Sequence, residues 1–140
     1  MFDTDRTTPY AALLLRVSMG VMFLAHGLLL KVGTFGLSGT MGFFGSLGYP
    51  PILGAVVAIG ETLAGIALIL GVGVRTASLA MVPVMIGATL QHAPAGWLFS
   101  AQGGGWEFPA FWMLALVVQA GLGAGAHALA PGRRQVAAMA

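Results

Sequence analysis

Four long apolar stretches constrain the fold of this 140-residue chain more than any other feature. They run over Tyr10–Leu30, Pro51–Leu70, Arg75–Gln91 and Glu107–Leu129. A helix needs about 20 apolar residues to cross about 30 Å of hydrocarbon, and in lipid the backbone must pair its polar groups internally. The sequence therefore predicts an all-α integral membrane protein, a four-helix bundle that forms a single domain over residues 1–140 in the lipid bilayer.

Composition indicates the same class of protein. Hydrophobic residues make up 58% of the chain and charged residues only 7%, whereas a soluble domain carries about a quarter charged residues. The six Lys and Arg residues are too few and too dispersed for a nucleic-acid-binding surface. Cysteine is absent, which excludes disulfides, thiol chemistry and iron–sulfur ligation by the chain's own residues.

The distribution of cations predicts the orientation in the membrane. One side, formed by the N-terminus, the second loop and the C-terminus, carries Arg6, Arg16, Arg75, Arg133 and Arg134. The other side carries only Lys31. The positive-inside rule then places both termini in the cytoplasm. We expect a multi-pass protein of the cell (inner) membrane, with its first apolar stretch retained as an anchor because the polar N-terminus does not resemble that of a signal peptide.

The two outer loops contain apolar and aromatic residues. In the first, Leu37, Met41 and Phe44 recur at helical spacing, which predicts a short interfacial helix. The second contains an aromatic group, Trp97, Phe99 and Trp106. These aromatic side chains either form an interfacial belt or, together with the first loop, cap a site between the helices.

A single carboxylate interrupts the second apolar stretch. Glu61 lies about ten residues into it, which at about 1.5 Å per residue places it about 15 Å deep, near the bilayer centre. Gly54, Ala58 and Gly65 share its helical face, and small residues at this spacing mark a close helix contact. Glu61 should therefore face the bundle, where a charge costs about 2.5 kcal/mol or more and needs a partner, a proton or water.

The first apolar stretch supplies three candidate partners for Glu61. His26 is closest in estimated depth, so it either shares a proton with Glu61 or is a neutral histidine bonded to a backbone group. Arg16 and Lys31 either reach inward or direct their charges outward along their long stems. His26, Glu61 and the outer His92 are the candidate catalytic residues.

Apart from Arg16, which belongs to the cytoplasmic side, the remaining candidates gather toward the outer surface. The proposed ligand-binding residues are Arg16, Lys31, Gln91, Trp106 and Glu107. Glu107 also suits the N-terminus of the last helix, where a carboxylate complements the helix dipole. No pair of residues has the spacing of a metal site, and no metal site is predicted. His26 and His92 differ in estimated depth, which argues against a bis-histidine haem.

In order and spacing, these residues resemble the DoxX family. The resemblance is carried by RVSMGVMFLAHGLLLK (16–31), GETLAGIALILGVGVRTAS (60–78) and GGWE (104–107), and it extends over residues 12 to 132. The positions that match the family pattern are Arg16, His26, Gly27, Lys31, Glu61, Arg75, His92 and Glu107. The C-terminus keeps Pro131, Gly132 and Arg133 but lacks the acid with which family members often end.

The resemblance implies a small four-helix inner-membrane protein of a redox system. Members are similar to the small subunit of a thiosulfate:quinone oxidoreductase, and a relative belongs to an oxidoreductase complex involved in thiol and oxidative stress. We therefore expect a membrane subunit that handles a quinone, possible partners being a second copy of the chain or a larger redox complex. A small proton-coupled transporter and a scaffold without chemistry are the alternatives.

Overall fold

The computed structural model describes residues 4–130, and every regular element among them is helical. The long first helix combines α1 (Thr4–Leu24) with a π-helix, η1 (Ala25–Thr34). After the short α2 come α3, α4, a 3₁₀ turn and α5, with these bounds: α2 Gly36–Ser46, α3 Pro51–Leu70, α4 Val74–His92, η2 Ala93–Ala95 and α5 Glu107–Leu122. The expected interfacial helix in the first outer loop corresponds to α2. Arg133 and Arg134, on which the predicted orientation partly depends, lie outside the described residues.

Three helical segments are long and apolar enough to cross a membrane. They are Thr4–Thr34, Pro51–Leu70 and Val74–Ala95, with 31, 20 and 22 residues. The fourth apolar helix, α5, is shorter, at 16 residues. It begins at Glu107 as expected, but the predicted end at Leu129 is wrong. The backbone leaves the helix at Gly123, where φ is 80°, a conformation that favours glycine, and it makes further left-handed turns at Gly125 and His127.

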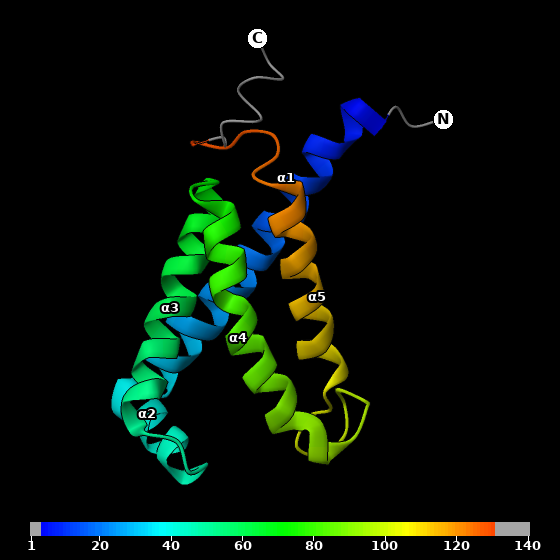
Figure 1. Cartoon of the computed structure of the whole chain (residues 1–140). Helices are drawn as coiled ribbons and strands as arrows, with labels where there is room; N and C mark the ends of the chain where they lie inside the picture. Colours follow the sequence, from blue (N-terminus) through cyan, green and yellow to red (C-terminus); the bar gives the residue numbers. More distant parts are fainter. Residues whose placement is uncertain (1–3, 131–140) are drawn as a thin grey trace.

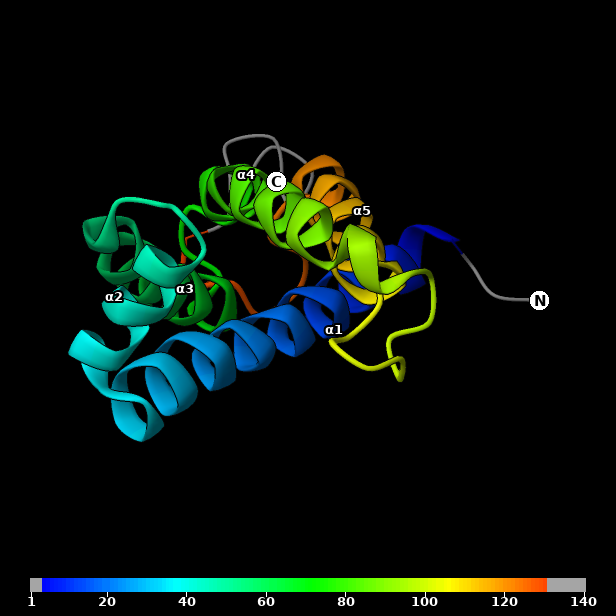
Figure 2. The ribbon, with the colours of Figure 1, turned by 90° about the horizontal axis from the view of Figure 1, so that it is seen from below.

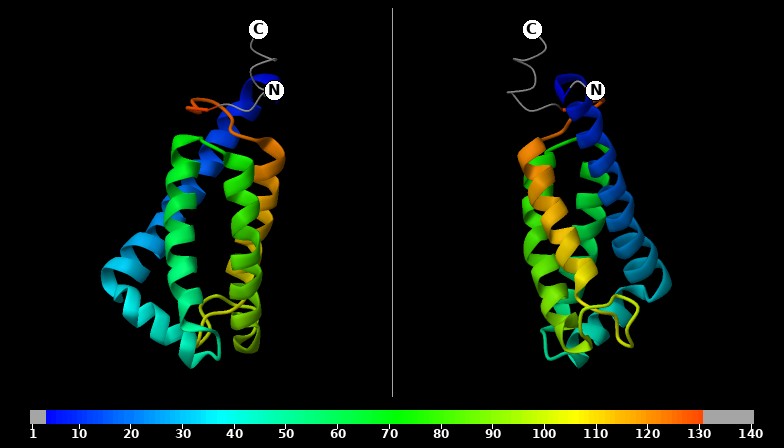
Figure 3. Two further views of the ribbon diagram at one scale, coloured as in Figure 1. Left: turned by 60° about the vertical axis from the view of Figure 1, so that its left-hand side comes forward. Right: turned by 90° about the vertical axis from the view of Figure 1, so that its right-hand side faces the viewer.

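The helices pack around one another in a closed order. Figures 1 and 3 show α3 and α4 as an antiparallel pair, with α5 beside α4 and α1 crossing the bundle obliquely. Viewed along the bundle, α1 closes the ring between α3 and α5 (Figure 2). The first turns of α1, the α3–α4 turn and the segment after α5 meet at one end. There the Ala126 N–H donates to Pro9 and the Leu129 N–H to Leu70.

Glycines on the long first helix, Gly20 in α1 and Gly27 in η1, and on α3 allow these helices to approach closely. A Cβ atom at Gly27 would lie 2.8 Å from the Thr62 nitrogen and 2.9 Å from the Ala58 oxygen. A Cβ at Gly20 would meet the Gly65 oxygen at 2.9 Å. The small-residue face that carries Glu61 is therefore a face of close helix contact, as its spacing predicts. Ala58 and Gly65 lie against the long first helix, whereas Gly54 lies against α2, where a Cβ would meet the Thr40 oxygen at 2.9 Å.

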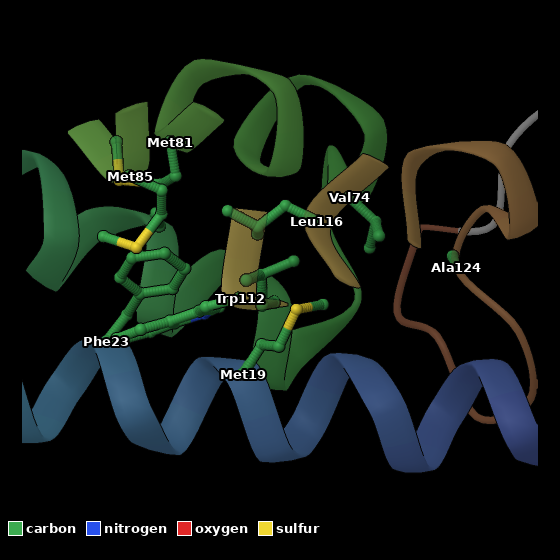
Figure 4. Packing of buried hydrophobic residues seen from close by; sticks show 10 residues of the cluster. Met19, Phe23, Val74, Met81, Met85, Trp112, Leu116 and Ala124 are labelled. Atoms are coloured by element: carbon green, nitrogen blue, oxygen red, sulfur yellow. The ribbon is translucent and has the colours of Figure 1, made fainter. Parts of the chain in front are cut away.

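Aromatic and thioether side chains form the core between α1, α4 and α5 (Figure 4). The Phe23 and Trp112 rings lie 4.5 Å apart between centroids, with Met19, Met81 and Met85 around them. Methionine side chains are flexible and polarisable, so they fill the irregular space beside aromatic rings. This core supports the inner wall of the cavity described below, because Met85 and Trp112 belong to both.

Candidate functional site

A cavity of about 450 Å³ opens in the half of the bundle that contains α2. Its walls come from η1, α2, α3, α4 and α5, and from the turn between α2 and α3. Most of the surface is apolar, including Phe43, Phe44 and Trp112. The polar and charged side chains that line it are His26, Lys31, Glu61, Gln91 and His92. Five of the eight predicted site residues, which are distant in sequence, therefore meet at one cavity.

An ion pair joins two of these residues across the helix contact. Lys31 Nζ lies 2.8 Å from Glu61 Oε2 and donates a hydrogen bond to it. The Glu61 side chain is 4% exposed and the Lys31 side chain 20% exposed. Lys31 therefore reaches inward rather than directing its charge to the outer surface, and it is the partner that the buried carboxylate needs.

The π-helix positions Lys31 and His26. Its wider turn is closed by bonds between residues five apart, such as the 2.9 Å bond from the Phe35 N–H to the Leu30 carbonyl. Lys31 and His26 are also five apart and both line the cavity. The Thr40 hydroxyl, from α2, donates to the Lys31 carbonyl at 2.8 Å and ties the two elements together. No sequence signal indicated this π-helix, which a 3.6-residue period does not describe.

His26 does not pair with Glu61. The proton-sharing pair, one of the two alternatives for His26, is replaced by the Lys31–Glu61 pair. The His26 ring instead packs against Trp112 with its edge, with centroids 5.4 Å apart. The flexible four-carbon stem of lysine spans the distance to the carboxylate, whereas the short imidazole stays against the aromatic ring. His26 and Glu61 nevertheless line the same cavity.

His92 and Gln91 close the cavity at the end of α4. His92 Nδ1 lies 3.0 Å from the carbonyl oxygens of both Gly103 and Gly104. This contact holds the loop between α4 and α5 against the helix end. His92 therefore lines the cavity and also holds the loop in place.

Trp106 and Glu107 lie at a second hollow, outside this cavity. That hollow, about 470 Å³, lies between the loop and α5 and includes Trp97 and Phe99. Glu107 Oε1 accepts the Phe99 N–H at 2.9 Å, and the Trp97 and Trp106 rings meet at 4.5 Å. Glu107 thus secures the loop at the start of α5, and the outer aromatic residues form a group of their own.

Arg16 lies at the other end of the bundle and takes no part in the cavity. It is fully buried, so it does not extend outward to the membrane surface. Its guanidinium donates five hydrogen bonds of 2.7 to 3.2 Å to carbonyls at the end of α3 and after α5, those of Leu68, Ile69, Ala124, Ala126 and His127. Carbonyls at a helix C-terminus lack intrahelical partners and favour a cation. Arg16 therefore fastens α1 to the ends of two helices, away from the cavity that five of the other predicted site residues line.

The sequence missed several residues that shape the cavity. Phe43 and Phe44 line it from α2, Tyr49 lines it from the turn between α2 and α3, and Trp112 forms part of its inner wall. The helical spacing of the first outer loop indicated α2, but no pattern indicated which of its side chains turn inward. Within residues 4–130, no group of three or more His, Cys, Asp or Glu side chains is arranged to hold a metal ion.

Comparison with known proteins identifies the chain's family. No curated protein and no solved structure matches it. Residues 11–101 match the family model described as DoxX, and this segment contains all five polar residues of the cavity. Since the match covers well over half of the 140 residues, the chain belongs to the DoxX family of membrane proteins.

Proposed function

We propose that this protein is an integral subunit of a membrane redox system and that its cavity binds the head group of a quinone. The observation that supports the proposal is the cavity itself. Its volume of about 450 Å³ lies within the range of about 300–1,000 Å³ typical of small-molecule sites. Such sites combine apolar walls with a few convergent polar groups, as here with Lys31, Glu61 and the two histidines.

The polar groups suit the chemistry of a quinone. A quinone carbonyl accepts hydrogen bonds, and the Lys31 ammonium is a donor beside the cavity. Reduction of a quinone to a hydroquinone takes up two electrons and two protons. We assign the electrons to a partner subunit that oxidises a thiol-class donor, and the protons to ionisable groups at the cavity, Lys31, Glu61 and the histidines.

The proposed setting is the inner membrane, crossed by all four apolar helices, with both termini in the cytoplasm. Arg6 and Arg75 lie at the starts of α1 and α4, and Arg16 bonds to the end of α3, so these three cations belong to the end at which the described chain begins. Lys31 belongs to the cavity end. By the positive-inside rule, the cavity then opens in the outer half of the bilayer. A quinone dissolved in the lipid can reach it there, and partner subunits or a second copy of the chain complete the complex.

Binding of a short-chain quinone to the purified protein in nanodiscs tests the proposal directly. Trp112 lines the cavity, so quinone should quench its fluorescence, and the Trp112→Phe variant identifies its share of the signal. Glu61→Gln and Lys31→Met should weaken binding and slow quinone reduction in membranes that contain the complete complex. Glu107→Gln is the matched control, because its carboxylate belongs to the second hollow. Absence of quinone binding by the wild-type protein would overturn the proposal.

One observation favours the alternative of a scaffold without chemistry. The Lys31–Glu61 pair joins η1 to α3, so it also fixes the register of these two segments. If the protein is a scaffold, Glu61→Gln should reduce the amount of assembled complex only as far as it reduces the amount of folded protein. A Glu61→Gln protein that folds and assembles normally but does not support quinone reduction would rule the scaffold out.

A further inference from the structure

The two edges of the His92 ring have different surroundings. Nδ1 lies 3.0 Å from the Gly103 and Gly104 carbonyl oxygens. A Cβ atom at Gly104 would lie 3.3 Å from Nδ1 and 3.4 Å from Cε1, so this side of the ring is packed against the loop. His92 also lines the cavity. Because the Nδ1 side of the ring is packed against the loop, we take the opposite edge, which carries Nε2, as the one that faces the cavity.

The loop contact determines where the ring carries its proton. Carbonyl oxygens only accept hydrogen bonds, so Nδ1 must carry the hydrogen that it shares with Gly103 and Gly104. In a neutral imidazole with a protonated Nδ1, Nε2 is an acceptor. Within residues 4–130, Nε2 makes no hydrogen bond to the protein. The cavity therefore presents an unused acceptor at His92.

Lys31 contributes the complementary group. An ammonium has three donors, and one of them is used by Glu61 at 2.8 Å. The cavity thus offers a donor from η1 and an acceptor from α4. An oxidised quinone carries only acceptors on its carbonyls and leaves Nε2 unpaired. A hydroquinone hydroxyl both donates and accepts, so the reduced ligand carries a partner for each kind of group, whereas the oxidised quinone carries a partner for Lys31 alone.

We infer that His92 makes the cavity selective for the hydroxylated, reduced form of its ligand by accepting an O–H hydrogen bond at Nε2. The inference rests on the proposed quinone site and names the form of the ligand that the site prefers. Tighter binding of the hydroquinone stabilises the reduced form and makes the bound quinone a better electron acceptor. His92 is here a specificity-determining residue, and it transfers no electron.

The tautomer is measured first, on ¹⁵N-histidine-labelled protein in nanodiscs at pH 8. His92 should show a protonated Nδ1 and an unprotonated Nε2, identified by the loss of its signals in His92→Asn. A short-chain hydroquinone should shift the Nε2 resonance, and its dimethyl ether, which lacks the hydroxyl hydrogens, should not. A protonated Nε2 in the free protein would overturn the inference.

Two substitutions separate the edges of the ring. In His92→Asn the amide N–H₂ falls near the position of Nδ1, which keeps the donor to the loop and removes the acceptor. In His92→Gln the amide falls near Nε2, which keeps an acceptor and removes the loop donor. Hydrogen exchange of the Trp106 and Glu107 amides, which bond to Gly96 and Trp97, reports whether the loop stays in place.

The wild-type protein should bind the short-chain hydroquinone up to about tenfold tighter than the quinone, since one hydrogen bond contributes about 0.5–1.5 kcal/mol net and 1.4 kcal/mol is tenfold. His92→Asn should lose this preference while the loop amides stay protected. His92→Gln should keep part of the preference while the loop exchanges faster. Quinone binding without any redox preference, or a preference unchanged in His92→Asn, overturns this inference and leaves the proposed function standing. If neither form binds, both fall.

Discussion

Lys31 Nζ donates to Glu61 Oε2 over 2.8 Å, and this bond joins the π-helix to the middle of α3. The two side chains are unequally buried, at 20% and 4% exposed. The charge that is harder to solvate is therefore the carboxylate. Removal of either partner leaves the other charge behind, with different consequences for stability.

The first prediction concerns this asymmetry. Lys31→Met leaves the Glu61 carboxylate buried without a partner and should lower the free energy of unfolding by about 3 kcal/mol. Glu61→Gln leaves a lysine whose long stem can turn its charge toward water, so the loss should be about 1 kcal/mol. The double variant should be more stable than the sum of the two losses implies. Denaturation in detergent micelles measures all three, and equal losses in the two single variants would contradict the assignment.

Arg16 should be among the most sensitive positions for folding. Arg16→Met leaves five carbonyls without their donor, and we expect a loss of about 3 kcal/mol or more, because bonds from a charged group contribute about 1.5–3 kcal/mol each without being additive. Arg16→Lys should restore only part of this stability, since an ammonium cannot reproduce the planar guanidinium. Arg75→Met removes the same charge from an exposed position and is the control. Thermal unfolding in nanodiscs distinguishes them, and a similar effect at both arginines would contradict the anchoring role.

The close approach of α1 and α3 predicts the effect of a single methyl group. Gly27→Ala would bring Cβ to 2.8 Å from the Thr62 nitrogen, and a backbone atom cannot yield as a flexible side chain can. Such overpacking should cost about 1–3 kcal/mol and move Lys31 relative to Glu61. Gly121→Ala meets no atom within 4 Å and should be neutral or stabilising by up to about 1 kcal/mol. Unfolding of the two variants in the same detergent gives the comparison, and equal stability would argue against the contact.

Two hydroxyls should respond differently to removal. The buried Ser78 hydroxyl has no hydrogen-bond partner among residues 4–130, so Ser78→Ala should leave stability unchanged within about 0.5 kcal/mol. The Thr40 hydroxyl donates to the Lys31 carbonyl, and Thr40→Val keeps its shape while losing that bond. A loss of about 1 kcal/mol is expected for Thr40→Val. Hydrogen exchange in α2 should also quicken in this variant, and a larger effect of Ser78→Ala than of Thr40→Val would refute the prediction.

Part of the site could be predicted because helical spacing is a local property. Gly54, Ala58 and Gly65 share a face with Glu61, and that periodicity alone turns the carboxylate toward the bundle. Likewise, the apolar stretches fix which residues lie deep and which lie near the surface, so Lys31, Gln91 and His92 fall toward one end. The sequence could not choose among the candidate partners of Glu61, since that choice depends on how α1 approaches α3 and on the π-helix that turns Lys31 inward.

Arg16 shows the limit of sequence reasoning most clearly. Its partners are backbone carbonyls of Leu68, Ile69 and the segment after α5, and a carbonyl has no residue-type signature. The end of α5 at Leu122 could not be predicted either, because it also depends on contacts with backbone carbonyls. The chain after Gly123 folds back over α1 and supplies acceptors to the guanidinium.

The sequence by itself determined the membrane class, the long apolar helices and the inward face of α3, because each follows from composition or from a period within one segment. Only the tertiary structure decided the partner of Glu61, the role of Arg16 and the residues that close the cavity. Those depend on distances between segments that are far apart in the chain. Close packing at glycines, the π-helix and the turn after α5 together set these distances.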